Sequence, residues 1–423
     1  MTQTISTAPL RAERKKHQPT LGELVFWPTF ILLMVIHCME NTTLNYYKPG
    51  WMPAVYLYRN ILYGVLFLKI AFLTTYRRKE LWWVLGALVV AVLCWRSTRD
   101  LQMIEWATIA IAAKDIPKQK LLYAFLLVKS VAIAMTLFLH EVGILPTLYY
   151  LNGNGPIYNT MGFCHRNVLG ANMAVLCLGW FYLRFRQIGT MDILFWVVLS
   201  AVTYFLAISR TGLIVMLMII AVMCLARKLE HRLASRPWTP QVFVGILAGL
   251  FLLCLLGAIL YREGVPFWDS LNELLTKRLS FSHQVLEDFG LRLFGQDLPF
   301  VTTMAAQTSD AKPLILDNSY MRAILYFGLI PGLSLLGLMG LSLWRAGKRD
   351  HISLVACLLV MAVFGVSESY LLDVFYNFPL LLSITLLFRR PTRAEAVRPV
   401  EYALEILRLG LQRGKQLLGR TGG

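Results

Sequence analysis

The sequence carries little charge for its length. Of its 423 residues, 15% are charged and 57% are hydrophobic, whereas soluble domains average about 25% charged residues. With a mean hydropathy of +0.58, this composition excludes an ordinary soluble domain and predicts a polytopic membrane protein. Acidic residues are the scarcer kind, with 24 Asp and Glu against 41 Lys and Arg. Lys and Arg collect in the cytoplasmic loops of membrane proteins, so the excess of basic residues is explained by membrane topology. A nucleic-acid partner is not indicated, because no polar segment is long enough to form a basic binding face.

Cysteine pairs and the motifs of soluble enzymes are also missing. The seven cysteines are scattered without a Cys-x-x-Cys pair, so neither a disulfide framework nor a zinc site is indicated, and we expect no metal and no cofactor. No Asp-x-Asp pair stands where a soluble sugar-nucleotide enzyme would need it. The chain also has no repeat of fixed period and no matched pair of interrupted helices of the kind that transporters use.

What the sequence does contain is a series of apolar runs of membrane-spanning length. Lys and Arg fall in alternate loops, which predicts an all-α bundle of about twelve transmembrane helices with both termini in the cytoplasm. The expected spans are Leu21–Met39, Met52–Leu73, Leu81–Trp95, Leu101–Ala113, Leu121–Gly143, Val168–Leu183, Ile193–Ile208, Leu213–Ala226, Val242–Leu260, Met321–Leu343, Ile352–Val366 and Val374–Phe388.

This pattern divides the chain into four parts. They are residues 1–260 with a basic cytoplasmic N-terminus and the first nine spans, 261–320 as one large extracytoplasmic loop, 321–390 with the last three spans, and 391–423 as a basic amphipathic cytoplasmic tail. Because the other connections are short, binding or chemistry is expected in the large loop. Apolar residues recur at helical spacing in the tail, which favours a helix lying on the lipid surface over a docking helix for a partner.

Cations gather at what this topology makes the outer mouth of the bundle. The positive-inside rule disfavours them there, and a guanidinium group suits phosphate oxygens, so the set predicts a cradle for a lipid diphosphate. The alternative explanation for each of these cations is that its side chain extends to the lipid head groups or forms an ion pair with a nearby carboxylate. Arg210 is the exception, because a charge is costly in a tight turn between two apolar helices. The set is Arg166, Arg210, Lys277, Arg278, Arg292 and Arg322.

Asp317 is the carboxylate that stands out near the same face. It directly precedes an apolar helix and is followed by Asn318 and Ser319. All three residue types suit a helix N-cap, so a capping role and a catalytic role are both open for Asp317. The two roles are compatible, because a helix N-terminus favours the carboxylate form and offers backbone donors to phosphate.

Two histidines and one buried pair complete the candidates. His165 and His283 lie on the outer side and could each act as a general base, although an isolated histidine is more often a locally satisfied loop residue. Within the spans, Glu105 and Lys129 lie on neighbouring helices and could pair there.

Four segments, taken in order, resemble the O-antigen ligase/polymerase superfamily, and most closely the Wzy-type polysaccharide polymerases of Gram-positive capsule and exopolysaccharide loci. They are Met161-Gly162-Phe163-Cys164-His165-Arg166-Asn167; Ser209-Arg210-Thr211-Gly212; Lys277-Arg278-Leu279-Ser280 through Phe294-Gly295-Gln296; and Asp317-Asn318-Ser319-Tyr320 running to Gly328 and Gly332. Glu368-Ser369-Tyr370 followed by Asn377 is also similar. The resemblance runs from Met161 to Asn377, and the N-terminal part is generic membrane sequence.

The resemblance implies a GT-C-like membrane glycosyltransferase that acts on undecaprenyl-diphosphate-linked oligosaccharides at the outer face of the bacterial cytoplasmic membrane, without a nucleotide donor. Its expected partners are that lipid-linked substrate, membrane lipid, a chain-length regulator and a flippase. We expect Asp317, Arg278 and Arg210 to be catalytic. The residues expected to bind substrate are Arg292, His165, Arg166, Asn318, Tyr320, Glu368 and His283.

Three functions compete on this basis. A polymerase joins lipid-linked repeat units, whereas a ligase transfers finished glycan to another acceptor. Related ligases have a histidine where this chain has Asp317, which favours the polymerase. A lipid-oligosaccharide flippase or small-solute transporter would need inverted repeats and ionisable residues near the middle of the membrane, and the sequence shows neither clearly.

Overall fold

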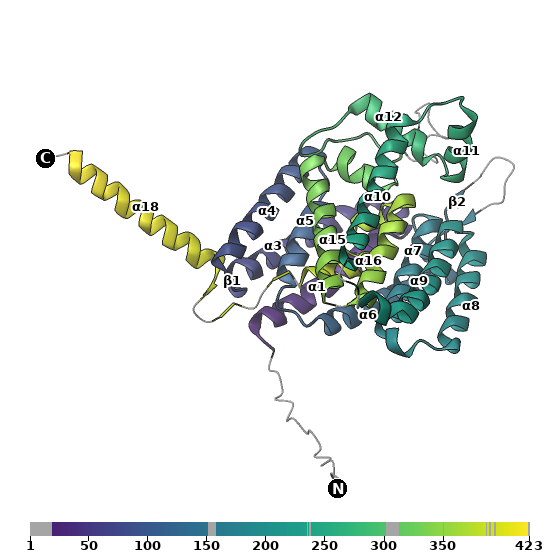
Figure 1. The fold of residues 1–423 in the computed structure, drawn as a ribbon, viewed down its shortest axis with the longest axis horizontal. Coiled ribbons are helices and arrows are strands. Elements are labelled where there is room, and N and C mark those ends of the chain that lie inside the picture. Colours follow the sequence, from purple (N-terminus) through teal and green to yellow (C-terminus); the bar gives the residue numbers. More distant parts are fainter. Residues whose placement is uncertain are drawn as a thin grey trace, which may run out of the picture.

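The computed structural model describes most of the chain as helices. The described residues are 19–150, 158–234, 236, 238–301, 313–349, 351–385, 387, 388, 391, 392 and 395–421. The basic N-terminal segment and the pair Arg389–Arg390, which served as topology markers, lie outside them. The long helices form one bundle, from which a C-terminal helix leaves sideways (Figure 1).

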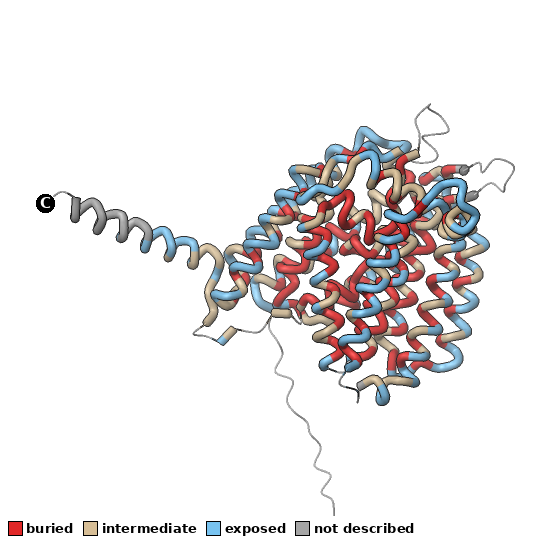
Figure 2. The backbone as a smooth tube through the Cα atoms, turned by 45° about the horizontal axis from the view of Figure 1, so that its top comes forward, coloured by how far each residue is buried: buried red, intermediate tan, exposed pale blue. Residues whose placement is uncertain are grey.

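Eight of the described helices are long and apolar enough to cross a membrane. They are α1 (Leu21–Glu40), the continuous helix Pro49–Leu73 that contains α3 (Met52–Leu68), α4 (Arg78–Thr98), α6 (Lys118–Glu141), α8 (Thr190–Ala207), α9 (Arg210–Ala234), α10 (Thr239–Leu260) and α15 (Leu329–Lys348). Between 22 and 44% of each apolar stretch is buried inside the protein. Much of the rest faces outward (Figure 2), with large apolar side chains such as Trp83 and Phe205 exposed, as contact with lipid requires. The all-α prediction is confirmed, and these apolar helices support the prediction of a multi-pass membrane protein.

Four expected spans correspond to shorter or less apolar helices. Helix α5 (Gln102–Ala112) has 11 residues and rises about 16 Å, about half the thickness of the hydrocarbon core. Helix α17 (Phe378–Ile384) has seven residues. Helices α7 (Arg166–Leu183) and α16 (Ile352–Ser367) are apolar because most of their residues pack inside the bundle. By length and composition, the described helices support eight of the expected spans.

The expected span Met321–Leu343 is interrupted. The chain forms α14 (Ser319–Met321) and the π-helix η4 (Arg322–Tyr326), and starts again as α15 after Gly328. Gly328 has φ +95°, and a Cβ there would fall 2.1 Å from the backbone nitrogen of Gly295. The two segments therefore cross at backbone contact, and only glycine permits this crossing.

Residues 261–301 cover one end of the bundle. They contain α11 (Pro266–Leu274) and α12 (Arg278–Phe289), which lie together beyond the end of α10 (Figure 1). Four short elements occur elsewhere in the described residues: α2 (Leu44–Tyr47), η1 (Pro49–Trp51), η3 (Phe185–Gln187) and η5 (Ser369–Leu372), with η2 (Lys69–Leu73) ending the second span. Strand β2 (Tyr149–Tyr150) pairs with β3 (Tyr158–Asn159) in antiparallel orientation.

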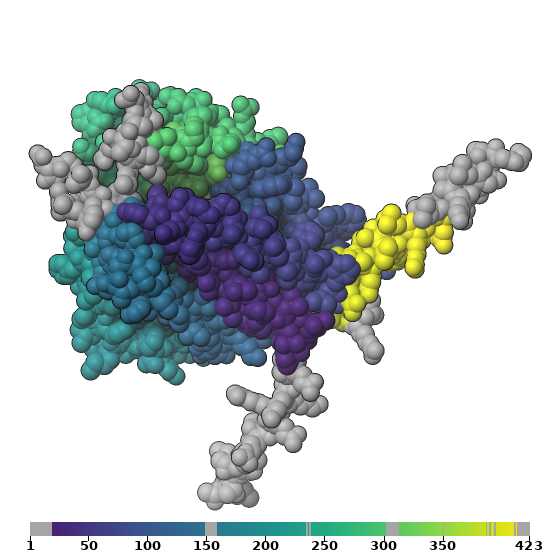
Figure 3. Space-filling view, turned by 180° about the vertical axis from the view of Figure 1, so that it is seen from behind, coloured from purple at the N-terminus to yellow at the C-terminus, as the bar shows by residue number. Residues whose placement is uncertain are grey.

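The C-terminal tail is anchored at the opposite end of the bundle. Strand β4 (Ala396–Val397) pairs with β1 (Tyr76–Arg77), and α18 (Pro399–Thr421) follows. An ion pair of 3.1 Å joins Arg78 to Glu405 on α18. The helix expected in the tail is present, and Figure 3 shows it standing away from the purple and blue N-terminal helices.

Candidate functional site

Three charged side chains from distant parts of the chain meet at the end of the bundle covered by α12. Nη2 of Arg278 lies 3.0 Å from Oε1 of Glu368 and 3.9 Å from Oδ2 of Asp317. Arg278 begins α12, Glu368 directly follows α16, and Asp317 precedes α14. The side chains of Arg278 and Glu368 are 11% and 8% exposed, whereas that of Asp317 is 43% exposed. The arginine and one carboxylate are therefore held inside the protein, and the second carboxylate is accessible.

An amide and a hydroxyl extend this cluster into the helices below. Nδ2 of Asn167 donates to Oε1 of Glu368 over 3.0 Å, and Oγ of Ser209 donates to Oδ1 of Asn167 over 3.1 Å. Thr211 also hydrogen-bonds with Glu368. Asn167, Ser209 and Thr211 lie in two of the segments that carry the family resemblance, but they were not among the predicted site residues. Their position at the first turns of apolar helices was the available signal.

The amide reaches the hydroxyl because α7 and α9 touch at their backbones. A Cβ on Gly212 would lie 2.7 Å from Cα of Gly170, and one on Gly170 would lie 2.7 Å from Oγ of Ser209. Such distances leave no room for a side chain at either position. The Ser-Arg-Thr-Gly segment therefore contributes contact between helices as well as polar groups.

Three non-glycine residues close to the site in sequence have a left-handed backbone conformation. Met161 has φ +51°, Ile208 has φ +49° and Lys277 has φ +62°. These residues directly precede or lie close to His165, Ser209 and Arg278 in sequence. A left-handed conformation costs a residue with a side chain about 1–3 kcal/mol and is concentrated at functional sites in proteins. The shared strain at these three residues supports a functional role for this end of the bundle.

Burial determines the protonation of the central carboxyl. It raises the pKa of Glu368 to about 8, and the neighbouring Asp317 carboxylate acts in the same direction. Arg278 and the hydrogen bonds from Asn167 and Thr211 oppose this shift by stabilising the ionised form. Glu368 is therefore a group whose charge changes within a moderate pH range.

His165 has a structural role that uses one of its ring nitrogens. Nδ1 accepts a hydrogen bond of 3.2 Å from the backbone N–H of Asn167 and so caps α7. Burial lowers the pKa of His165 to about 4, with Arg166 and Arg278 acting in the same direction. The imidazole is thus neutral near pH 7 and fixes the start of the helix that carries Asn167.

Three other predicted cations lie at the same end of the bundle. Arg166 and Arg210 are the first residues of α7 and α9; Arg166 is half-buried and Arg210 is exposed. Arg292 is exposed, and its backbone carbonyl accepts from the N–H of Leu329 over 2.9 Å.

Asn318, Tyr320 and His283 are engaged in packing. Asn318, rather than Asp317, caps α14, with its side chain accepting from the N–H groups of Tyr320 and Met321. Tyr320 is fully buried, and its hydroxyl donates to the carbonyl of Ala362 over 2.8 Å. Asn318 is therefore the N-cap residue, and Asp317 does not cap this helix.

His283 ties α12 to the preceding helix. Its Nδ1 lies 2.8 Å from the carbonyl of Ala258 at the end of α10. Nε2 lies 3.3 Å from the exposed carboxylate of Glu287. These contacts position the helix that begins with Arg278, so the structure gives His283 a supporting place.

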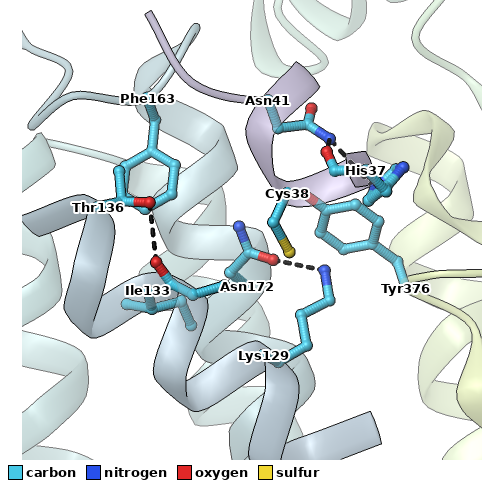
Figure 4. Close-up of a pocket in the computed structure, with 10 residues that line it drawn as sticks. His37, Cys38, Asn41, Lys129, Ile133, Thr136, Phe163, Asn172 and Tyr376 are labelled. Atoms are coloured by element: carbon cyan, nitrogen blue, oxygen red, sulfur yellow. Dashed lines mark hydrogen bonds between the residues drawn. The ribbon is translucent and has the colours of Figure 1, made fainter. Parts of the chain in front are cut away.

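A second polar group lies inside the bundle below the site. Nζ of Lys129 donates to Oδ1 of Asn172 over 2.6 Å and lies 3.7 Å from the centre of the Tyr376 ring. Figure 4 shows these side chains with His37 around a cavity of about 10 Å³, which is roughly the room of one water molecule. Lys129 therefore binds Asn172, and Glu105, its expected partner, hydrogen-bonds instead with Tyr63.

Comparisons with known proteins do not identify this arrangement. No protein-family model matches the chain, and the searches of curated proteins and of solved structures gave no significant match. Among the described residues, no group of three or more His, Cys, Asp or Glu side chains could hold a metal ion. The chemistry of the cluster must be inferred from its arginine and carboxylates.

Proposed function

We propose that the protein is a polysaccharide polymerase of the bacterial cytoplasmic membrane that joins undecaprenyl-diphosphate-linked oligosaccharide repeat units at the outer face. The observation that carries the proposal is the position of Arg278 between a buried and an accessible carboxylate, at one end of a membrane-embedded bundle. The segments that contain these residues resemble the O-antigen ligase/polymerase superfamily, and this resemblance suggests the class of substrate. About twelve spans, cytoplasmic termini and an extracytoplasmic placement of residues 261–320 belong to the same proposal.

The proposed reaction is a single inverting displacement. A hydroxyl of the acceptor sugar attacks C1 of the donor glycan, a new C1–oxygen bond forms, and the bond from C1 to the diphosphate oxygen breaks. Undecaprenyl diphosphate leaves with the bonding electron pair, and the hydroxyl proton passes to the carboxylate of Asp317. This carboxylate is suited to the role because it is 43% exposed and can meet an incoming sugar.

Arg278 would act on the leaving group. Its guanidinium group stabilises negative charge that develops on the diphosphate oxygens, an effect that is strongest in a site with little water. Glu368 holds the guanidinium in place, and Asn167 holds Glu368. Nε of Arg278 is buried and, among the described residues, has no hydrogen-bond partner, so a shift of this side chain would free a donor for a substrate oxygen. Arg166, Arg210 and Arg292 would attract the diphosphate toward the cluster.

Glycan analysis in cells tests this proposal. A strain lacking the gene is complemented with wild type, Arg278→Ala or Asp317→Asn at matched protein levels, and lipid-linked and surface glycans are separated on gels. The polymerase predicts that single repeat units accumulate on the lipid carrier and that long chains are lost in both variants. Long chains that remain on the carrier without reaching their acceptor would favour the ligase. An unchanged ladder in both variants would refute an enzymatic role of the cluster.

The buried group around Lys129 favours a second candidate, a lipid-oligosaccharide flippase or solute transporter. Ionisable side chains deep in a membrane protein commonly mark a transport path, and Lys129 is 1% exposed in the middle of α6. Substitution Lys129→Met separates the two functions. If the protein is a transporter, the variant should fail to move its substrate across the membrane. If it is a polymerase, the variant keeps the outer cluster and should still elongate glycan on lipid-linked units that are already at the outer face.

A further inference from the structure

A large cavity lies at the end of the bundle opposite α11 and α12. Its volume is about 440 Å³, within the range of sites for small ligands. Helices α7, α9 and α16 connect it to the cluster around Arg278, because each of them has one end at the cluster and its other end at the cavity. Nothing in the proposed glycan transfer uses this cavity.

The charged residues of the cavity wall are mostly basic. Lys118 and Arg186 line it, and the charge of Arg349 acts on Lys118 from nearby. The carboxylate in the wall is that of Glu230, which lies 3.4 Å from the largely exposed guanidinium of Arg186. Two cations against one carboxylate leave an excess of positive charge at the wall.

Two helices also begin at this cavity. Helix α6 starts at Lys118 and α16 starts at Ile352, and neither has a side-chain hydrogen bond at its N-cap. Their first residues, including Gln119 and Ser353, line the cavity. The first backbone N–H groups of a helix have no partner within it and carry partial positive charge. Two such helix ends strengthen the preference of the cationic wall for an anion.

The remaining wall is apolar. It includes Leu122, Tyr182, Leu183, Phe185 and Leu382. We infer that this cavity binds a phosphate group, contributed either by a phospholipid of the adjoining leaflet or by a soluble phosphorylated compound. Lys118 and the two helix ends face the phosphate, and the apolar wall accommodates the group attached to it. This inference is independent of the proposed function, because it concerns the other end of the bundle.

Ligand-dependent thermal stability tests the inference. The full chain, purified in phosphate-free detergent, is titrated with inorganic phosphate, with phosphatidylglycerol, or with a phosphate-free galactolipid. Binding to the folded state raises Tm as ligand is added. We expect a rise with inorganic phosphate or phosphatidylglycerol and none with the galactolipid. A response to both indicates recognition of the phosphate group alone, and a response to phosphatidylglycerol only identifies a lipid site.

Two variants and a matched control locate the effect. Lys118→Ala should weaken the apparent Kd at least tenfold, and Arg186→Ala, which changes an exposed side chain and leaves packing intact, should weaken it severalfold. Lys120→Ala removes the same charge from an exposed residue on the same helical turn outside the cavity wall, and should bind as wild type does. The inference is overturned if neither phosphate probe raises Tm, or if Lys120→Ala weakens binding as much as Lys118→Ala.

Discussion

Nη2 of Arg278 lies 3.0 Å from Oε1 of Glu368, although 90 residues separate the two in sequence. The contact joins the first residue of α12 to the residue that follows α16. It therefore fixes the segment that covers the bundle to the bundle itself.

Substituting Glu368 by Ala should destabilise the protein. The change leaves a buried guanidinium N–H without the acceptor that lies 3.0 Å from it, and a buried donor left unsatisfied in this way costs about 1–3 kcal/mol. Thermal unfolding in detergent measures the effect. Glu287→Ala is the matched control, because it breaks the contact of a 67% exposed carboxylate with His283 and should change stability by no more than about 0.5 kcal/mol. Equal effects of the two substitutions would contradict the importance of the buried pair.

Arg278→Lys should reduce glycan polymerisation about a hundredfold although it keeps the charge. An ammonium group cannot bond Glu368 and a phosphate oxygen with the fixed fork geometry of guanidinium. The length distribution of lipid-linked glycan at matched expression is the measurement. Arg262→Lys, an exposed change within the same polar interval, should leave the ladder as in wild type. Near-normal chains in Arg278→Lys would remove this residue from the proposed site.

Glu368 should make stability fall as pH rises from about 5 to about 8, whereas His165, whose pKa is lowered to about 4, acts in the opposite direction below about pH 6.5. The pKa of Glu368 is raised to about 8 in the folded protein from its ordinary value of 4.5, so between these values the folded state binds more protons than the unfolded state. Stabilisation from the protonated group is then lost as pH rises through the folded pKa. Midpoints of thermal unfolding across this range report the slope. In Glu368→Gln the unfolding midpoint should depend less on pH. An unchanged pH dependence would assign the effect to other titrating groups.

Gly212→Ala should impair both stability and activity. Its methyl group would meet Cα of Gly170 at 2.7 Å, so α7 and α9 must separate and Asn167 must move away from Ser209. Overpacking of this kind costs about 1–3 kcal/mol. Gly245→Ala provides the comparison, because a Cβ at that position on α10 meets nothing within 4 Å. Unfolding midpoints and glycan ladders that match for the two variants would argue against the close crossing.

Hydrophobic runs predicted the helices well, because burial in protein and burial in lipid both require an apolar sequence. For the same reason they could not distinguish α16, which is packed inside the protein, from α10, which exposes much of its surface. The interruption at Gly328 depends on contact with Gly295, and a contact between distant segments leaves no periodic signal. The break was therefore missed.

The candidate site was predicted in part for a similar reason. Arg278 was predicted as a cation at the outer mouth, Asp317 as a carboxylate before an apolar helix and Glu368 from the family resemblance. The structure brings the three side chains together. Asn167 and Ser209 are ordinary polar residues whose role comes from the packing of α7 on α9. Tyr320 follows a polar segment in sequence, but its ring turns into the core. The local sequence shows the type of each residue, whereas these roles depend on where the folded chain points each side chain.

Helix α16 has 16 residues and therefore rises about 24 Å, less than the roughly 30 Å of a typical hydrocarbon core. Helix α10 beside it has 22 residues and rises about 33 Å. A straight helix of this length ends short of at least one face of such a hydrocarbon core. Glu368 directly follows α16 and its side chain is 8% exposed, so protein groups rather than bulk water surround this carboxyl.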